Sequence, residues 1–106
     1  MDRADVAASE RRFVAHTGVV SRRIANETIL VPVASNVGDL DAIYTLSDVG
    51  SEVWALLRAP VSVQQIADVL CAEYDVRPDV AMKDVHEFLD KLVATKLVEP
   101  VASREV

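Results

Sequence analysis

The chain has 106 residues, enough for one domain with a modest core. An apolar fraction of 51% argues against disorder, and a formal charge of −6 disfavours nucleic acid, whose phosphates an acidic surface repels. No apolar run approaches the roughly 20 residues of a membrane span, and the N-terminus lacks the apolar segment of a signal peptide. The single cysteine, Cys71, cannot form an internal disulfide, so we expect a cytoplasmic protein without a membrane partner.

The first half of the chain has the pattern of a small sheet. Residues 1–17 are polar and charged, and we expect an N-terminal tail there. Residues 19–24 and 28–33 alternate between apolar and polar positions, as β-strands do. Pro32 has no N–H to donate, so it should lie near the end of its strand. With a third strand at residues 43–46, these segments predict an antiparallel meander.

The third strand is expected to run directly into a helix. Ser47 should cap this helix through its hydroxyl, and Asp48 adds negative charge at the positive end of the helix dipole. Apolar residues then recur at helical spacing, with Trp54 beside them in the core. If this strand is the last of the sheet, its outer edge lies open beside the helices.

Two further helices complete the pattern. Ser62 and Gln65 form a capping-box pair at the start of the second helix. Pro78 suits the first turn of the third helix, which should end near Thr95. The third helix carries the clearest periodicity of the chain, at Val85, Phe88, Leu89, Leu92 and Val93.

We therefore predict an α+β, winged-helix-like fold, with a three-stranded antiparallel sheet followed by three helices. One domain should span residues 18–99, with a short extended segment at 97–99 near its end. Residues 100–106 are predicted to form a C-terminal tail.

The sequence offers no pattern of catalytic residues. His16 and His86 lack partners at ligand spacing, so we expect no metal site and no cofactor. Cys71 has no basic neighbour that would lower its pKa, which favours a small core residue over a nucleophile. A binding module is therefore favoured over an enzyme.

Four motifs in succession resemble the PqqD-like family, small peptide-recognition domains (RiPP recognition elements) found beside enzymes that modify ribosomally made peptides. The resemblance covers about residues 19–99 and rests on ETILVPV (27–33), AIYTLSDVGSEVWALL (42–57), PVSVQQIADVLCAEYDV (60–76) and DVHEFLDKLVATKLV (84–98).

The chain departs from the family pattern at three places. The family usually has Asn where Ser47 stands and an acid-glycine pair near Arg58-Ala59. It also has Gly where Lys96 stands, so we expect the last helix to end differently here.

The resemblance implies that the leader segment of a precursor peptide binds as an added strand on the free edge of the third strand, in a groove walled by the third helix. It implies Ile43, Tyr44 and Thr45 as the edge. The implied wall is Val80, Asp84, Phe88 and Lys91, with Lys83 and Glu87 at the rim. The bound peptide would be presented to a separate modifying enzyme, such as a radical SAM maturase, a protease or a cyclase.

Two alternatives stay open at this point. A winged-helix nucleic-acid binder is motivated by the helix order and by a run of arginines without intervening acids, Arg11, Arg12, Arg22 and Arg23; the acidic charge and the lack of a basic recognition helix disfavour it. A self-associating regulatory domain would form a homodimer through the same open sheet edge.

Overall fold

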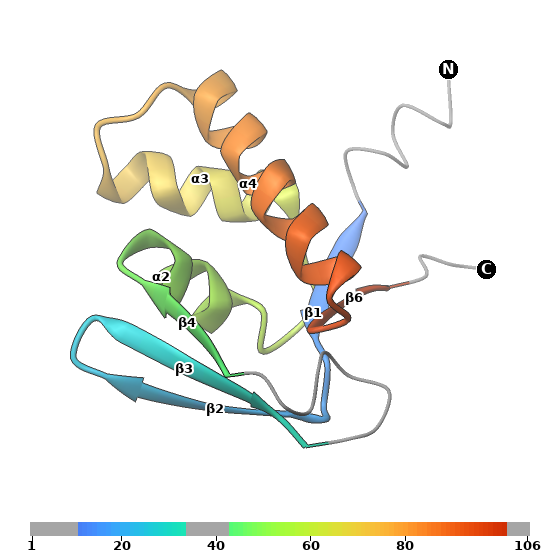
Figure 1. The fold of residues 1–106 in the computed structure, drawn as a ribbon. Helices are drawn as coiled ribbons and strands as arrows, with labels where there is room; N and C mark the ends of the chain where they lie inside the picture. The colour runs from blue at the N-terminus through green and yellow to red at the C-terminus, as the bar shows by residue number, and fades with distance from the viewer. Residues whose placement is uncertain (1–10, 34–42, 102–106) are drawn as a thin grey trace.

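A computed structural model describes residues 11–33 and 43–101. Its elements form two three-stranded antiparallel sheets and three helices, which confirms the predicted α+β class (Figure 1). In chain order they are β1 (Arg12–Ala15), β2 (Val19–Ile24), β3 (Glu27–Pro32), β4 (Tyr44–Ser47), α2 (Val49–Leu56), β5 (Val61–Ser62), α3 (Val63–Glu73), α4 (Pro78–Ala94) and β6 (Val98–Val101).

The predicted meander is present as the sheet β2–β3–β4, which we call the meander sheet. Ala25 adopts a left-handed φ of 56° in the turn between β2 and β3. Pro32 is the last residue of β3, as expected for a residue that cannot donate to the ladder. Thr28 and Leu30 are buried on the face of this sheet that the three helices cover (Figure 1).

The junction between β4 and α2 differs from the prediction. Ser47 does not cap the helix, because it remains in β4 and pairs with Glu27. The N-cap is Asp48, whose side chain makes no capping hydrogen bond. Its backbone turns the chain at φ 49° and ψ −114°, and its carbonyl accepts the N–H of Glu52 at 3.1 Å. The backbone turn at Asp48 therefore replaces the expected side-chain cap.

The other two helices begin where the sequence predicts. Ser62 and Gln65 form the reciprocal capping box, and Pro78 is the first residue of α4. The end of α4 corrects a prediction, because Lys96 adopts a left-handed φ of 65°. The N–H of Lys96 donates to the Val93 carbonyl and that of Leu97 to the Leu92 carbonyl, both at 2.9 Å. This is the Schellman ending that glycine usually makes, and a lysine makes it here.

A second sheet, β5–β1–β6, was not predicted, and we call it the closing sheet. Arg12–Ala15 were assigned to a tail but form β1 at its centre, with Phe13 only 5% exposed in the core. The predicted segment at 97–99 is part of β6, which extends two residues further than expected. Pro100 fits there because β6 is an edge strand and pairs with β1 alone. Residues 1–10 and 102–106 of the predicted tails lie outside the described residues.

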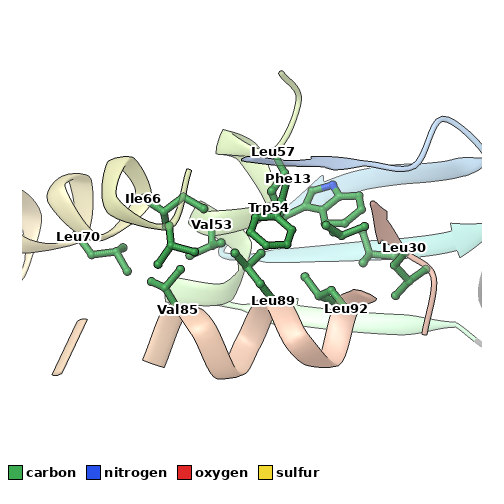
Figure 2. Packing of buried hydrophobic residues seen from close by; sticks show 13 residues of the cluster. Phe13, Leu30, Val53, Trp54, Leu57, Ile66, Leu70, Val85, Leu89 and Leu92 are labelled. Carbon is green, nitrogen blue, oxygen red and sulfur yellow. The ribbon is translucent and has the colours of Figure 1, made fainter. Parts of the chain in front are cut away.

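The core lies between the helices and the two sheets. Figure 2 shows Leu89 of α4 beside Trp54 of α2 and Phe13 of β1, with Val85 further along the same helix towards Ile66 of α3. Burial of one large apolar side chain contributes about 1.5–3 kcal/mol, so this cluster is the main source of stability. The Thr28 and Ser51 hydroxyls share a buried hydrogen bond that joins β3 to α2. The start of α2 is thereby fixed against the meander sheet.

Candidate functional site

Strand β4 forms the edge of the meander sheet in the part of the chain that the structure describes. The N–H of Asp48 donates to the Asn26 carbonyl at 3.0 Å, on the side of β3. Because alternate residues of an antiparallel strand face the same neighbour, Leu46 and Tyr44 also direct their main-chain groups towards β3. Thr45 therefore directs its N–H and carbonyl away from β3, towards the sheet edge.

The ladder between β2 and β3 leads to the same assignment of which residues direct their main-chain groups towards which strand. The N–H of Val33 donates to the Gly18 carbonyl at 2.8 Å, so odd-numbered residues of β3 face β2 and even-numbered residues face β4. The pairs Thr28 with Leu46 and Leu30 with Tyr44 are then the hydrogen-bonded pairs of the β3–β4 ladder. Two independent contacts thus assign the outward main-chain groups to Thr45.

The predicted edge residues point to opposite faces of the sheet. Tyr44 and Leu46 pack against the core, on the face that the helices cover. Thr45 is exposed on the other face, and Ile43 lies just before β4 with 69% of its side chain exposed. A chain laid along β4 would therefore meet both an inner, helix-facing surface and an outer, open one.

An apolar pocket of about 190 Å³ lies between the three helices, next to the end of β4. Its lining comes from the start of α2, from α3 and from α4: Val49, Gly50, Val53, Leu70, Asp84, Val85 and Phe88. A Cβ at Gly50 would lie 3.4 Å from Phe88 Cζ and 3.6 Å from Leu46 Cβ. The Phe88 ring therefore connects the pocket to the edge strand.

The structure brings only part of the predicted wall to this pocket. Asp84 and Phe88 line it, and Asp84 is its one charged lining residue. The other four predicted residues of α4, namely Val80, Lys83, Glu87 and Lys91, are exposed and do not line it.

Five lining residues were absent from the predicted set: Val49, Gly50, Val53, Leu70 and Val85. Helical periodicity indicates that four of them belong to apolar faces. It does not indicate where two such faces leave a cavity between them.

Acidic side chains gather where α2 begins and α3 ends. A hydrogen bond from Glu73 to Glu52, together with the repulsion between their charges, raises the pKa of Glu73 above its ordinary value. The pKa of Tyr74 is raised by desolvation and then by the negative charge of Glu52. These two glutamates lie one turn from the pocket-lining residues Val49 and Leu70 on the same two helices, and neither of them lines the pocket.

The arginine run does not form a single basic patch. Arg22 and Arg23 are neighbours in β2 and so point to opposite faces of the meander sheet. Arg11 lies over the ring of Phe13, 5.6 Å from its centroid, beside the other sheet. The feature that motivated a nucleic-acid binder is therefore divided between separate surfaces.

Residues 11–33 and 43–101 hold neither a cluster of metal ligands nor a membrane-spanning helix. No three His, Cys, Asp or Glu residues in these ranges lie together as metal ligands would. None of the helices in the same ranges has both the length and the apolar character of a membrane span.

Comparisons with known proteins identify the family of the chain. The family model of coenzyme PQQ synthesis protein D (PqqD) matches residues 27–98, a range that contains β4 and the whole pocket lining. The chain is similar to a solved structure described as TbiB1 in complex with the TbiA(beta) leader peptide, with a TM-score of 0.72 and 30% sequence identity. That similarity covers 85% of this chain and 99% of the other. No curated protein sequence matched the chain.

Proposed function

The chain belongs to the PqqD family of RiPP recognition elements, and we propose that it captures the leader segment of a ribosomally made precursor peptide as a strand added to β4. The observation that carries the proposal is the likeness to a structure that holds a leader peptide. It is supported by the position of β4, an edge strand of the described chain beside an apolar pocket. Edge strands with an adjacent groove are a recurrent site of peptide capture.

Main-chain hydrogen bonds supply the part of the affinity that does not depend on peptide sequence. The N–H and carbonyl of Thr45 are the groups that would pair with the added strand, because they point away from β3. Ile43 precedes this position, and Tyr44 supports it by pairing with Leu30 on the other side. The peptide would therefore extend the meander sheet without displacing any bond of the β3–β4 ladder.

Side-chain selectivity would come from the helical side. Every second side chain of an added strand faces the helices, where an apolar residue can enter the pocket against Phe88. Val80, Lys83, Glu87 and Lys91 would contact the flanking peptide along the exposed side of α4. One strand with two or three anchored side chains is compatible with a Kd on the order of a micromolar, about −8 kcal/mol.

We assign no chemical step to this chain. Its role would be to hold the precursor beside a separate modifying enzyme, such as a radical SAM maturase, a protease or a cyclase. Holding the leader raises the effective concentration of the attached core peptide at that enzyme.

A main-chain substitution at Thr45 tests the proposal. Thr45→Pro removes the outward N–H and leaves the bonds to β3 in place, whereas Thr45→Val keeps the N–H and a side chain of similar shape. The probe is the TbiA(beta) leader peptide, titrated by calorimetry. We expect the proline variant to bind at least about tenfold more weakly and the valine variant to bind like the wild type. Equal binding by both variants, each shown to be folded by circular dichroism, would refute strand addition at this edge.

A further inference from the structure

Exposed apolar side chains are concentrated on the meander sheet. Seven large apolar residues of the described chain are exposed, and four of them lie on or directly beside this sheet. Their exposed fractions are 55% for Val20, 52% for Ile24, 59% for Val33 and 69% for Ile43. Apolar groups gathered in one area of a surface usually mark an interface.

Strand pairing places Val20 and Ile24 on one continuous surface. Paired residues of an antiparallel ladder point to the same face, and Val20 pairs with Val31, Arg22 with Ile29 and Ile24 with Glu27. We call this surface the outer face and define it by those six residues. The helices lie on the opposite side of the sheet (Figure 1), and no described segment packs on the outer face.

The charges on the outer face differ from those of the whole chain. Arg22 and Glu27 are its two charged residues, so the face is neutral, whereas the chain carries a formal charge of −6. They lie on adjacent strands, with Arg22 beside Ile29 and Glu27 two residues before Ile29, at the start of β3. Two copies of an acidic protein repel each other least where their surfaces carry no net charge.

We infer that the outer face is the interface of a twofold dimer of this chain. In a twofold arrangement a contact between Arg22 of one copy and Glu27 of the second is made twice. The same arrangement would bury Val20 and Ile24 of each copy between two stacked sheets, the packing found in β-sandwiches. The face is thus complementary to itself in charge.

This dimer would leave the proposed peptide site accessible. The edge of β4 lies to the side of the outer face, and the pocket lies behind it, on the helical side of the sheet. Each copy could therefore hold its own leader. A dimer that paired through the β4 edge would instead compete with the peptide for Thr45. The inference does not depend on the proposed function, and peptide affinity is a separate measurement.

Complementary charge variants give a direct test by sedimentation velocity up to millimolar protein concentration. We expect the wild type to convert from monomer to dimer with concentration, and Arg22→Glu and Glu27→Arg each to remain monomeric. An equimolar mixture of the two variants should regain the dimer, because each opposed pair is then again of unlike charge. Ile24→Ser should also be monomeric, and all three variants should keep the wild-type circular dichroism spectrum.

Several outcomes would overturn the inference. These are a wild type that stays monomeric throughout, a mixture that does not associate, and a dimer that Ile24→Ser leaves unchanged. A dimer that dissociates when a leader peptide binds would assign the contact to the β4 edge instead. Loss of peptide binding by a variant that remains folded would bear on the proposed function and not on the dimer.

Discussion

The two sheets of this protein differ in how their strands are connected and in what they leave open. The meander sheet joins strands that follow one another, and it ends in β4 with an edge and a face that no described segment covers. The closing sheet joins residues 12–15, 61–62 and 98–101, which are far apart in the chain. The meander sheet has an open edge and an open face, and the closing sheet attaches strands from both ends of the described chain to the helical core.

Hydrogen bonds outside the strand ladders also attach the closing sheet to the rest of the domain. The N–H of Ala15 donates to the Leu57 carbonyl at 2.8 Å, and that of His16 to the Leu97 carbonyl at 2.9 Å. Phe13 brings the central strand β1 into the core at 5% exposure, and Val98 brings the edge strand β6 into it at 1% exposure. Substitutions in the closing sheet should therefore change stability, and substitutions at the meander edge should change binding.

The largest expected effect is on stability, from Phe13→Ala. It removes a buried ring and leaves a cavity, which should lower the free energy of unfolding by about 3–5 kcal/mol in urea titrations. The control Phe13→Leu should cost less than about 1.5 kcal/mol. Peptide affinity of the folded fraction should stay at the wild-type value. A loss below about 1 kcal/mol for the alanine variant would mean that β1 is not part of the core.

Gly50→Leu at the pocket should weaken peptide binding without lowering stability, the reverse of the effect expected for Phe13→Ala. A leucine side chain would occupy the space beside Phe88 and should weaken leader binding at least about tenfold, as measured by calorimetry. Stability should not fall, because leucine favours a helix more than glycine does. Gly50→Ala is the matched control, since its Cβ makes ordinary contact with Phe88 and should leave binding nearly intact. Unchanged affinity of the leucine variant would exclude the pocket from the peptide site.

A smaller gain in stability is expected from Lys96→Gly. Lys96 adopts a left-handed φ of 65°, which costs a non-glycine residue about 1 kcal/mol. Glycine should raise the free energy of unfolding by about 0.5–1 kcal/mol, and Lys96→Ala should give no gain. An alanine variant as stable as the glycine variant would show that loss of the lysine side chain, and not backbone conformation, is responsible.

The smallest effect concerns pH and the pair Glu52 and Glu73. The pKa of Glu73 is raised in the folded chain, so the folded state binds this proton more tightly than the unfolded state does. The resulting stabilisation is complete below the ordinary glutamate pKa and is lost as pH rises through the raised one. Glu52→Gln should therefore gain stability over the wild type as pH rises above the ordinary glutamate pKa, measured by urea titrations at several pH values. If the free energies of unfolding of Glu52→Gln and the wild type differ by the same amount at every pH, the interaction between Glu52 and Glu73 is contradicted.

Local patterns were sufficient to predict the meander, the three helices, the capping box at Ser62 and the position of Pro78. They were insufficient for β1, because its four residues become a strand only when residues near 61 and 100 supply partners. Ser47 was misassigned because it pairs with Glu27 in the sheet, a contact that overrides its capping preference. Lys96 shows the same limit, since a Schellman ending is set by the whole helix terminus and tolerates a lysine.

The candidate site was predictable in kind but only partly in residues. The family resemblance implied Tyr44 and Thr45 on the edge strand and Asp84 and Phe88 on the wall formed by α4. The pocket also needs Gly50 and Leu70, whose nearness to Phe88 depends on how α2 and α3 pack. The spacing of residues within one helix does not show how neighbouring helices pack against each other.

Amide hydrogen exchange of β4, followed by NMR with and without leader peptide, is the most direct test of the central claim. Bound peptide should slow exchange of the Thr45 amide strongly. Exchange of the Leu46 amide, which faces β3, should change much less. A peptide that binds while the Thr45 amide exchanges at its original rate would contradict strand addition on β4.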